Sequence, residues 1–236
     1  MQRSVFDESS VKRFHWTILG FGLLPGLACL CLGCGTGDYE QKLRDRKVVT
    51  KFDDFLPAEN VPDAKLSIRV PKGFNVLAKG GNIDAKRVEP GVLKAAWLKR
   101  TYEKLVKDGD NEKPCYCYIG TPEQISQDDL AKQFRNELNA INGNNIVDWA
   151  DFQSEAPDTR EVKWRKLRCT APMEFYCKDK AGKEQFQTEP GVVEVYVREE
   201  GGVIVIVVWK LPASIEGSVK LDELSKLVAG GITIVK

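Results

Sequence analysis

An uninterrupted apolar stretch near the C-terminus restricts the fold more than any other segment. Val203 to Trp209 reads Val-Ile-Val-Ile-Val-Val-Trp, so an extended chain here has no polar face. A strand that is apolar on both faces is typical of the interior of a sheet covered on both sides. Gly201-Gly202 precedes this stretch and follows Val192–Arg198, which predicts a tight antiparallel hairpin. We therefore expect a sheet with a covered central strand.

Further strands are predicted around this hairpin. Thr101–Lys107 and Cys115–Thr121 flank the polar loop Asp108–Asn111, which predicts a second hairpin. A helix over Val92–Val106 is the competing prediction. The other expected strands are Leu66–Val70, Phe74–Leu77, Val162–Cys177 with a break near Pro172, and Ile232–Val235.

Two segments of the same region predict helices. Ser126–Ile141 has apolar residues at helical spacing, and Ser126 with Asp129 resembles a capping box. Ser218 is expected to cap a second helix, whose apolar residues are Leu221, Leu224, Leu227 and Val228. The predicted fold class is α+β, an antiparallel β-sheet flanked by two or more α-helices after an N-terminal signal or anchor helix.

The N-terminus carries an export pattern. Trp16 to Gly33 is apolar and uncharged, and three basic residues precede it. The run ends in Cys31-Leu32-Gly33-Cys34, followed by small and polar residues. This resembles the lipobox of bacterial lipoproteins, in which a signal peptidase cuts before a cysteine that receives diacylglycerol. The resemblance implies a signal peptide over 1–33, lipidation of Cys34, and a membrane-anchored domain in the cell envelope, outside the cytoplasm.

Two alternatives to the lipoprotein remain open. The apolar run is just long enough to span a bilayer as an uncleaved helix. Five basic residues follow the run closely and would hinder translocation, whereas Pro25 and several glycines favour a signal peptide. Ordinary cleavage without lipidation is the second alternative. In the lipoprotein interpretation, residues 34–61 form the lipidated N-terminus and a polar helical stalk that ends before Pro57, and 62–236 form a single α+β domain.

The C-terminal arrangement of strand, tight turn, strand, loop, helix and short strand is joined by an opening strand with the sequence Ile-Arg-Val-Pro-Lys-Gly-Phe. Together they resemble the PsbP-like fold, over roughly residues 62–236. The resemblance implies an antiparallel sheet flanked by helices and a largely non-catalytic, protein-binding role. It is topological, so it assigns no functional residue.

Composition excludes several function classes. The chain has 35 basic and 34 acidic residues among 236, which argues against a nucleic-acid partner. His15 is the only histidine, and it lies in the segment expected to be removed. Ser-His and Cys-His nucleophiles and histidine-ligated zinc are therefore not expected. We expect no cofactor and no metal.

Four cysteines follow Cys34, namely Cys115, Cys117, Cys169 and Cys177. An even number in an oxidising compartment suggests disulfides. Cys115 and Cys117 lie at i and i+2, whereas Cys169 and Cys177 are about 26 Å apart on a straight strand. Bridging therefore needs a bend, for which Pro172 is the candidate. One disulfide, two disulfides, four buried free thiols, and a metal or redox role all remain open.

Few residues suggest chemistry. Asp148 and Asp151 flank Trp149 and are candidates for acid–base catalysis on an envelope polymer. The favoured interpretation of this segment is a polar loop. Lys163, Arg165, Lys166 and Arg168 surround Trp164, and the speculative binding surface is Trp149, Trp164, Arg165 and Arg168. Core tryptophans and a solvated strand face are the favoured interpretations here.

No catalytic residues are assigned, and the chain is not expected to be an enzyme. The predicted function is a membrane-tethered lipoprotein whose domain binds an envelope protein or plays a structural part. A carboxylate-dependent envelope hydrolase and a thiol-redox or metal-binding protein are the alternatives.

Overall fold

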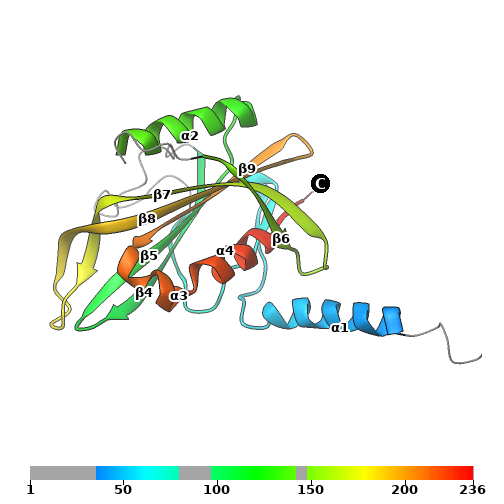
Figure 1. Cartoon of the computed structure of the whole chain (residues 1–236), viewed down its shortest axis with the longest axis horizontal. Helices are drawn as coiled ribbons and strands as arrows, with labels where there is room; N and C mark the ends of the chain where they lie inside the picture. The colour runs from blue at the N-terminus through cyan, green and yellow to red at the C-terminus, as the bar shows by residue number, and fades with distance from the viewer. Residues whose placement is uncertain (1–35, 80–96, 142–147, 236) are drawn as a thin grey trace, which may run out of the picture. The chain divides into compact units, whose positions relative to one another are not determined.

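The computed structural model describes residues 36–79, 97–141 and 148–235 (Figure 1). The chain divides into two compact units, Met1–Gln41 and Lys42–Lys236. The described part of the first unit is the beginning of α1 (Thr36–Lys51). The apolar run before Cys34 lies outside the described residues. In the described ranges, no helix is long and apolar enough to cross a membrane.

A seven-stranded antiparallel sheet forms the centre of the second unit. Its order is β3 (Asn75–Lys79), β4 (Leu98–Asp108), β5 (Asn111–Gly120), β9 (Val203–Pro212), β8 (Glu184–Glu200), β7 (Glu161–Lys178) and β6 (Ala150–Glu155). β9 lies between β5 and β8, and all but its first residue are buried. The apolar stretch therefore forms the covered central strand that the sequence predicts.

Both predicted hairpins are confirmed. Gly201 and Gly202 join β8 to β9 with φ of +60° and +77°, the pair of positive values that a type I′ turn requires. β4 and β5 pair up to Asp108 and Asn111, with Gly109 in the turn. The competing helix over Val92–Val106 is wrong from Leu98 onward, and residues 92–96 are outside the described ranges.

The predicted break near Pro172 is wrong, because β7 runs unbroken from Glu161 to Lys178. Pro172 stands directly opposite Pro190 of β8. The pairing of β6 with β7 stops at Lys166 and does not reach Pro172. The last residue of β9, Pro212, stands opposite Gly191, so no β9 residue pairs with Pro190. Each proline therefore has a paired strand on one side only, and no strand of the described chain pairs with it on the other side. A missing N–H removes no ladder hydrogen bond there.

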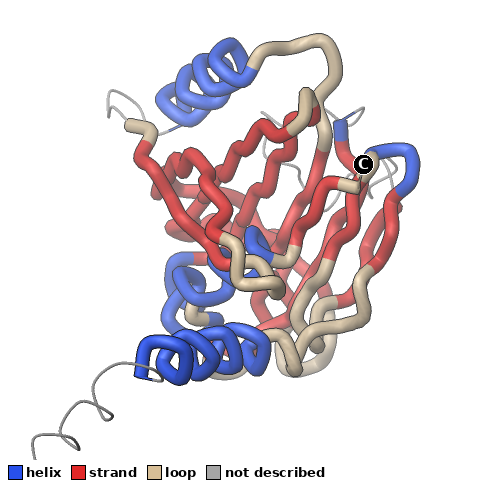
Figure 2. The backbone as a smooth tube through the Cα atoms, turned by 90° about the vertical axis from the view of Figure 1, so that its right-hand side faces the viewer, coloured by secondary structure: helices blue, strands red, loops and turns tan. Residues whose placement is uncertain are grey.

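Helices cover the two faces of the sheet, which separates two cores (Figures 1 and 2). On one face α2 (Gln127–Ile141) packs through Leu130, Phe134 and Leu138. The opposite face carries α3 (Glu216–Val219), α4 (Leu221–Gly230) and a small sheet. The small sheet has the order β1 (Glu59–Val61), β2 (Leu66–Ile68) and β10 (Ile232–Ile234), and short 3-10 turns lie at Pro62–Ala64 and Ala213–Ile215. The predicted α+β class is thus observed.

The helix caps agree with the sequence at one helix and differ at the other. The Asp129 N–H donates to Ser126 Oγ at 3.1 Å, so the predicted N-terminus of α2 is confirmed. Ser218 does not cap α4, because it lies inside α3 and the N-cap position belongs to Lys220. Lys220 has φ of +51°, which turns the chain sharply between these two short helices.

The segment expected to form a polar stalk contributes to the core. Val48, Phe52 and Phe55 are buried in the cluster beneath α4, and β1 pairs with β2. α1 ends at Lys51, before the stop expected at Pro57. Three large apolar side chains close to one another outweigh the polar composition of the surrounding sequence. The compact unit accordingly begins at Lys42.

Candidate functional site

The sheet sorts the cysteines onto opposite faces. Cys115 and Cys117 belong to the core beneath α4, whereas Cys169 belongs to the core beneath α2. Together with Cys177 they are buried free thiols, so the structure contains none of the bridges that the sequence left open. Within the described ranges, no group of three or more His, Cys, Asp or Glu is placed to hold a metal. Cys34 lies outside those ranges.

The four thiols are poor nucleophiles in the folded state. Burial raises the pKa of Cys115 to about 12 and that of Cys177 to about 11. Burial also raises the pKa of Cys117 and of Cys169. Because the thiolate is the reactive form, these cysteines are suited to packing rather than to thiol chemistry.

Asp148 and Asp151 have different surroundings. The Asp148 carboxylate is exposed and pairs with Arg135 at 2.9 Å. Asp151 lines a groove with Glu155 of the same strand. Asp151 and Glu155 are four residues apart on β6, which places them about 13 Å apart along the strand. The carboxylate directly opposite Glu155 is that of Glu161 on β7.

The four residues of the speculative binding surface do not share one face. Trp164 is buried, and its indole N–H donates to Ser154 Oγ at 3.1 Å. Arg168 lies on the same side of the sheet as Trp164 and belongs to a polar network there. Arg165 lies on the other side, 5.4 Å from the centre of the Trp149 ring. The Trp149 indole N–H donates to the Ala131 carbonyl at 3.1 Å. Strand alternation separates residues that are adjacent in sequence.

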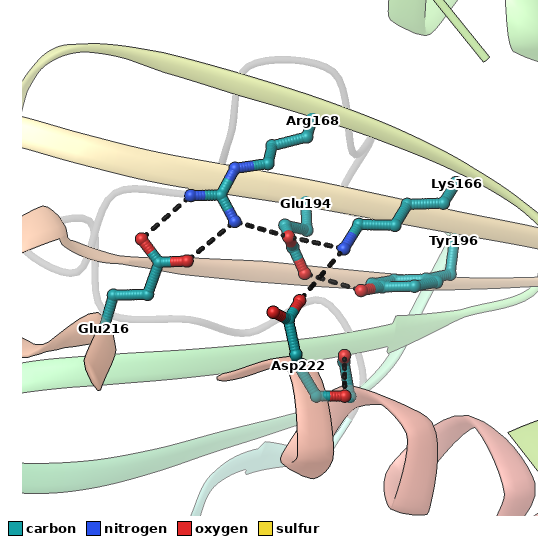
Figure 3. A network of polar contacts seen from close by, with 7 residues as sticks. Lys166, Arg168, Glu194, Tyr196, Glu216 and Asp222 are labelled. Carbon is teal, nitrogen blue, oxygen red and sulfur yellow. Dashed lines mark hydrogen bonds and ion pairs between the residues drawn. The ribbon is translucent and has the colours of Figure 1, made fainter. Parts of the chain in front are cut away.

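A buried carboxylate organises the network around Arg168 (Figure 3). Glu194 of β8 is fully buried, and its Oε1 accepts from Lys166 Nζ at 2.7 Å and from Arg168 Nη1 at 2.9 Å. The Tyr196 hydroxyl donates to Glu194 Oε2 at 2.5 Å. Burial, together with this carboxylate, raises the pKa of Tyr196 far above its usual range.

The same network attaches the helices to the sheet. Arg168 donates to both Glu216 oxygens at 2.7 and 2.8 Å, which raises the pKa of its guanidinium. Lys166 Nζ also lies 3.6 Å from Asp222 of α4. Each of these cations contacts two carboxylates, one on β8 and one on a helix, so the network holds α3 and α4 against the sheet. Sequence reasoning missed Glu194, although it is the one charge in the apolar run Val192–Val197.

A groove of about 610 Å³ lies along β6 in the second unit. Five consecutive β6 residues line it, together with the C-terminal end of α1, Phe52, Glu161 of β7 and two residues of α4. The lining residues are Val48, Lys51, Phe52, Asp151, Phe152, Gln153, Ser154, Glu155, Glu161, Lys226 and Leu227. The lining combines four apolar side chains, Val48, Phe52, Phe152 and Leu227, with charged and polar ones.

Comparison with known proteins gives fold neighbours of low similarity. No family model and no curated protein matches the chain. The solution structure of cyanobacterial PsbP (CyanoP) from Synechocystis sp. PCC 6803 has 14% identity and a TM-score of 0.40, over 77% of this chain and 93% of that chain. LpqN of Mycobacterium tuberculosis, described as involved in cell envelope biogenesis, has 10% identity and a TM-score of 0.39, over 72% and 83%. The Saccharomyces cerevisiae Ran-binding protein Mog1p has 11% identity and a TM-score of 0.39, over 76% of this chain and 95% of that chain.

PsbP-like proteins are thus among the structural neighbours, as the sequence resemblance implied. Likeness at this level carries no argument about what this chain binds.

Proposed function

We propose that this chain is an exported lipoprotein, tethered to a membrane through Cys34, whose α+β domain binds a protein partner without catalysing a reaction. The tether is supported by the apolar run and the lipobox-like Cys31–Cys34. The binding role is supported by one observation, the groove along β6 with its mixed apolar and charged lining. The hydrolase alternative paired Asp151 with Asp148, which is not among the residues that line the groove.

The tether predicts a specific mass for the protein extracted from membranes. We expect a chain that begins at Cys34 and carries acyl groups, since two or more chains are needed for stable anchoring. Peptide mapping after alkylation should find Cys115, Cys117, Cys169 and Cys177 unmodified in the folded protein. The same four should be alkylated after denaturation without reductant. A full-length, unacylated mass would refute lipidation, and fewer than four thiols in the denatured sample would reveal bridges.

The binding role predicts that crosslinking depends on position. A photo-crosslinking residue in place of Lys226, which is exposed and lines the groove, should give a discrete adduct in intact membranes. The matched control replaces Lys132, an exposed lysine of α2 on the opposite face of the sheet. Equal adducts from both positions, or none from Lys226, would contradict a binding role for the groove.

A further inference from the structure

β6 ends the seven-stranded sheet, so one of its two edges has no neighbouring strand in the described chain (Figure 1). In an antiparallel pair, opposed residues alternate between exchanging two backbone hydrogen bonds and exchanging none. The Ala156 N–H donates to the Arg160 carbonyl at 2.9 Å. This fixes the alternation, because the opposed pairs Glu155–Glu161, Gln153–Lys163 and Asp151–Arg165 must then be the non-bonded ones. The backbone groups of Asp151, Gln153 and Glu155 therefore point away from β7.

α4 closes one end of this edge. A Cβ added at Gly230 would lie 2.0 Å from the Glu155 carbonyl oxygen, so the end of α4 touches that carbonyl directly. Asp151 and Gln153 lie farther along the same edge, and both residues line the groove. Unpaired strand edges of this kind are templates for another strand.

The side chains of the groove define what such a strand must carry. Val48, Phe52 and Leu227 line it, and all three pack with the core beneath α4. Phe152 extends the apolar side and packs edge-on against Tyr196, with ring centroids 4.8 Å apart. Successive strand residues point to opposite sides, so every second residue of an added strand would meet this apolar wall.

On the other side of the edge two carboxylates stand opposite each other. Glu155 and Glu161 are directly opposite each other in the register, an arrangement of like charges that is destabilising. Lys51 lies 3.6 Å from Glu155 Oε2 and offsets one of the two carboxylates. A cation supplied by the bound strand would offset the second.

We propose that the open edge of β6 binds an extended segment of a partner protein by strand addition, with aliphatic side chains toward Val48, Phe52 and Leu227 and a lysine or arginine toward Glu155 and Glu161. This inference rests on the proposed binding function and adds the mode of binding and the chemistry of the partner. Main-chain hydrogen bonds supply affinity, and alternate side chains supply specificity.

The test uses the synthetic peptide Val-Lys-Val-Lys-Val-Lys-Val and the whole chain. We expect peptide binding to slow hydrogen exchange at the Asp151 and Gln153 amides. Gln153→Pro removes the outward N–H but no bond to β7, and edge positions of this kind tolerate proline. It should weaken binding by about tenfold or more, whereas the matched Gln153→Ala should bind like the parent. Glu161→Gln should reduce the preference for this peptide over its glutamate counterpart.

Several outcomes would overturn strand addition. One is equal affinity in Gln153→Pro and the parent, with far-ultraviolet circular dichroism showing that both are folded. Another is a dimer that Gln153→Pro dissociates while the peptide does not bind, which would assign the edge to a second copy of the chain. If the Lys226 crosslink forms but these amides stay unprotected, strand addition is wrong and the binding function stands. If neither is seen, the binding function fails as well.

Discussion

Replacing Glu194 by alanine is expected to lower the free energy of unfolding by about 1–3 kcal/mol, because it removes the buried acceptor that two cations share, although each cation keeps a second carboxylate. Lys166 and Arg168 both bind Glu194 Oε1, and the Glu194 side chain has no exposed surface. The substitution also removes the acceptor of the Tyr196 hydroxyl. An unsatisfied buried group costs more than an ordinary hydrogen bond contributes. Urea-induced unfolding of the parent and the variant measures the difference.

Two further variants separate the buried charge from general effects of substitution. Glu194→Gln keeps the shape of the side chain but removes its charge, so it should also be strongly destabilising. Glu216→Ala removes the partly exposed partner of Arg168 and should cost clearly less, because Glu194 still binds the guanidinium. A loss below about 1 kcal/mol in Glu194→Ala would mean that the network does not fasten α3 and α4.

Lys210→Met is expected to stabilise the domain at pH 7, by up to about 3 kcal/mol. Lys210 is almost completely buried in β9, and its ammonium lies 5.4 Å from the centre of the Phe175 ring. Burial lowers its pKa from the usual 10.5 to about 8, and the charge of Glu174 opposes the shift only partly. Methionine has a similar volume and no charge to bury. Loss of the cation–π contact offsets part of the gain.

The pH dependence of this difference has a definite sign. Between pH of about 8 and 10.5 the unfolded chain holds the Lys210 proton and the folded chain does not, so the parent gains stability as the pH rises. The advantage of Lys210→Met should therefore be largest below pH 8 and shrink toward pH 10.5. Groups that both proteins share, such as Tyr102 with its raised pKa, cancel in the difference.

Unfolding curves at a series of pH values measure the effect. Lys163→Met serves as the control, because Lys163 is an exposed lysine of β7 and its replacement should change stability by less than about 0.5 kcal/mol. A difference for Lys210→Met that stays constant from pH 7 to 10.5 would contradict the lowered pKa.

Local signals predicted much of the framework. The apolar run Val203–Trp209 predicted the central strand, and Gly201-Gly202 predicted the turn before it, because turn chemistry and strand patterning act over a few residues. Ser126 and the apolar spacing behind it predicted α2 for the same reason. Pro172 was misleading, since the cost of a strand proline depends on whether a neighbouring strand needs its N–H.

By itself the sequence determined the α+β class, both hairpins and α2, and the tether at Cys34 remains a prediction from the sequence. Only the tertiary structure decided which side chains meet. It placed Cys115 and Cys169 on opposite faces of the sheet, buried Glu194 among cations, and formed one groove from α1, β6 and α4. The reason is that turns and periodicity are local properties. Charge partners and an open edge depend on strand register and on which distant elements cover the sheet.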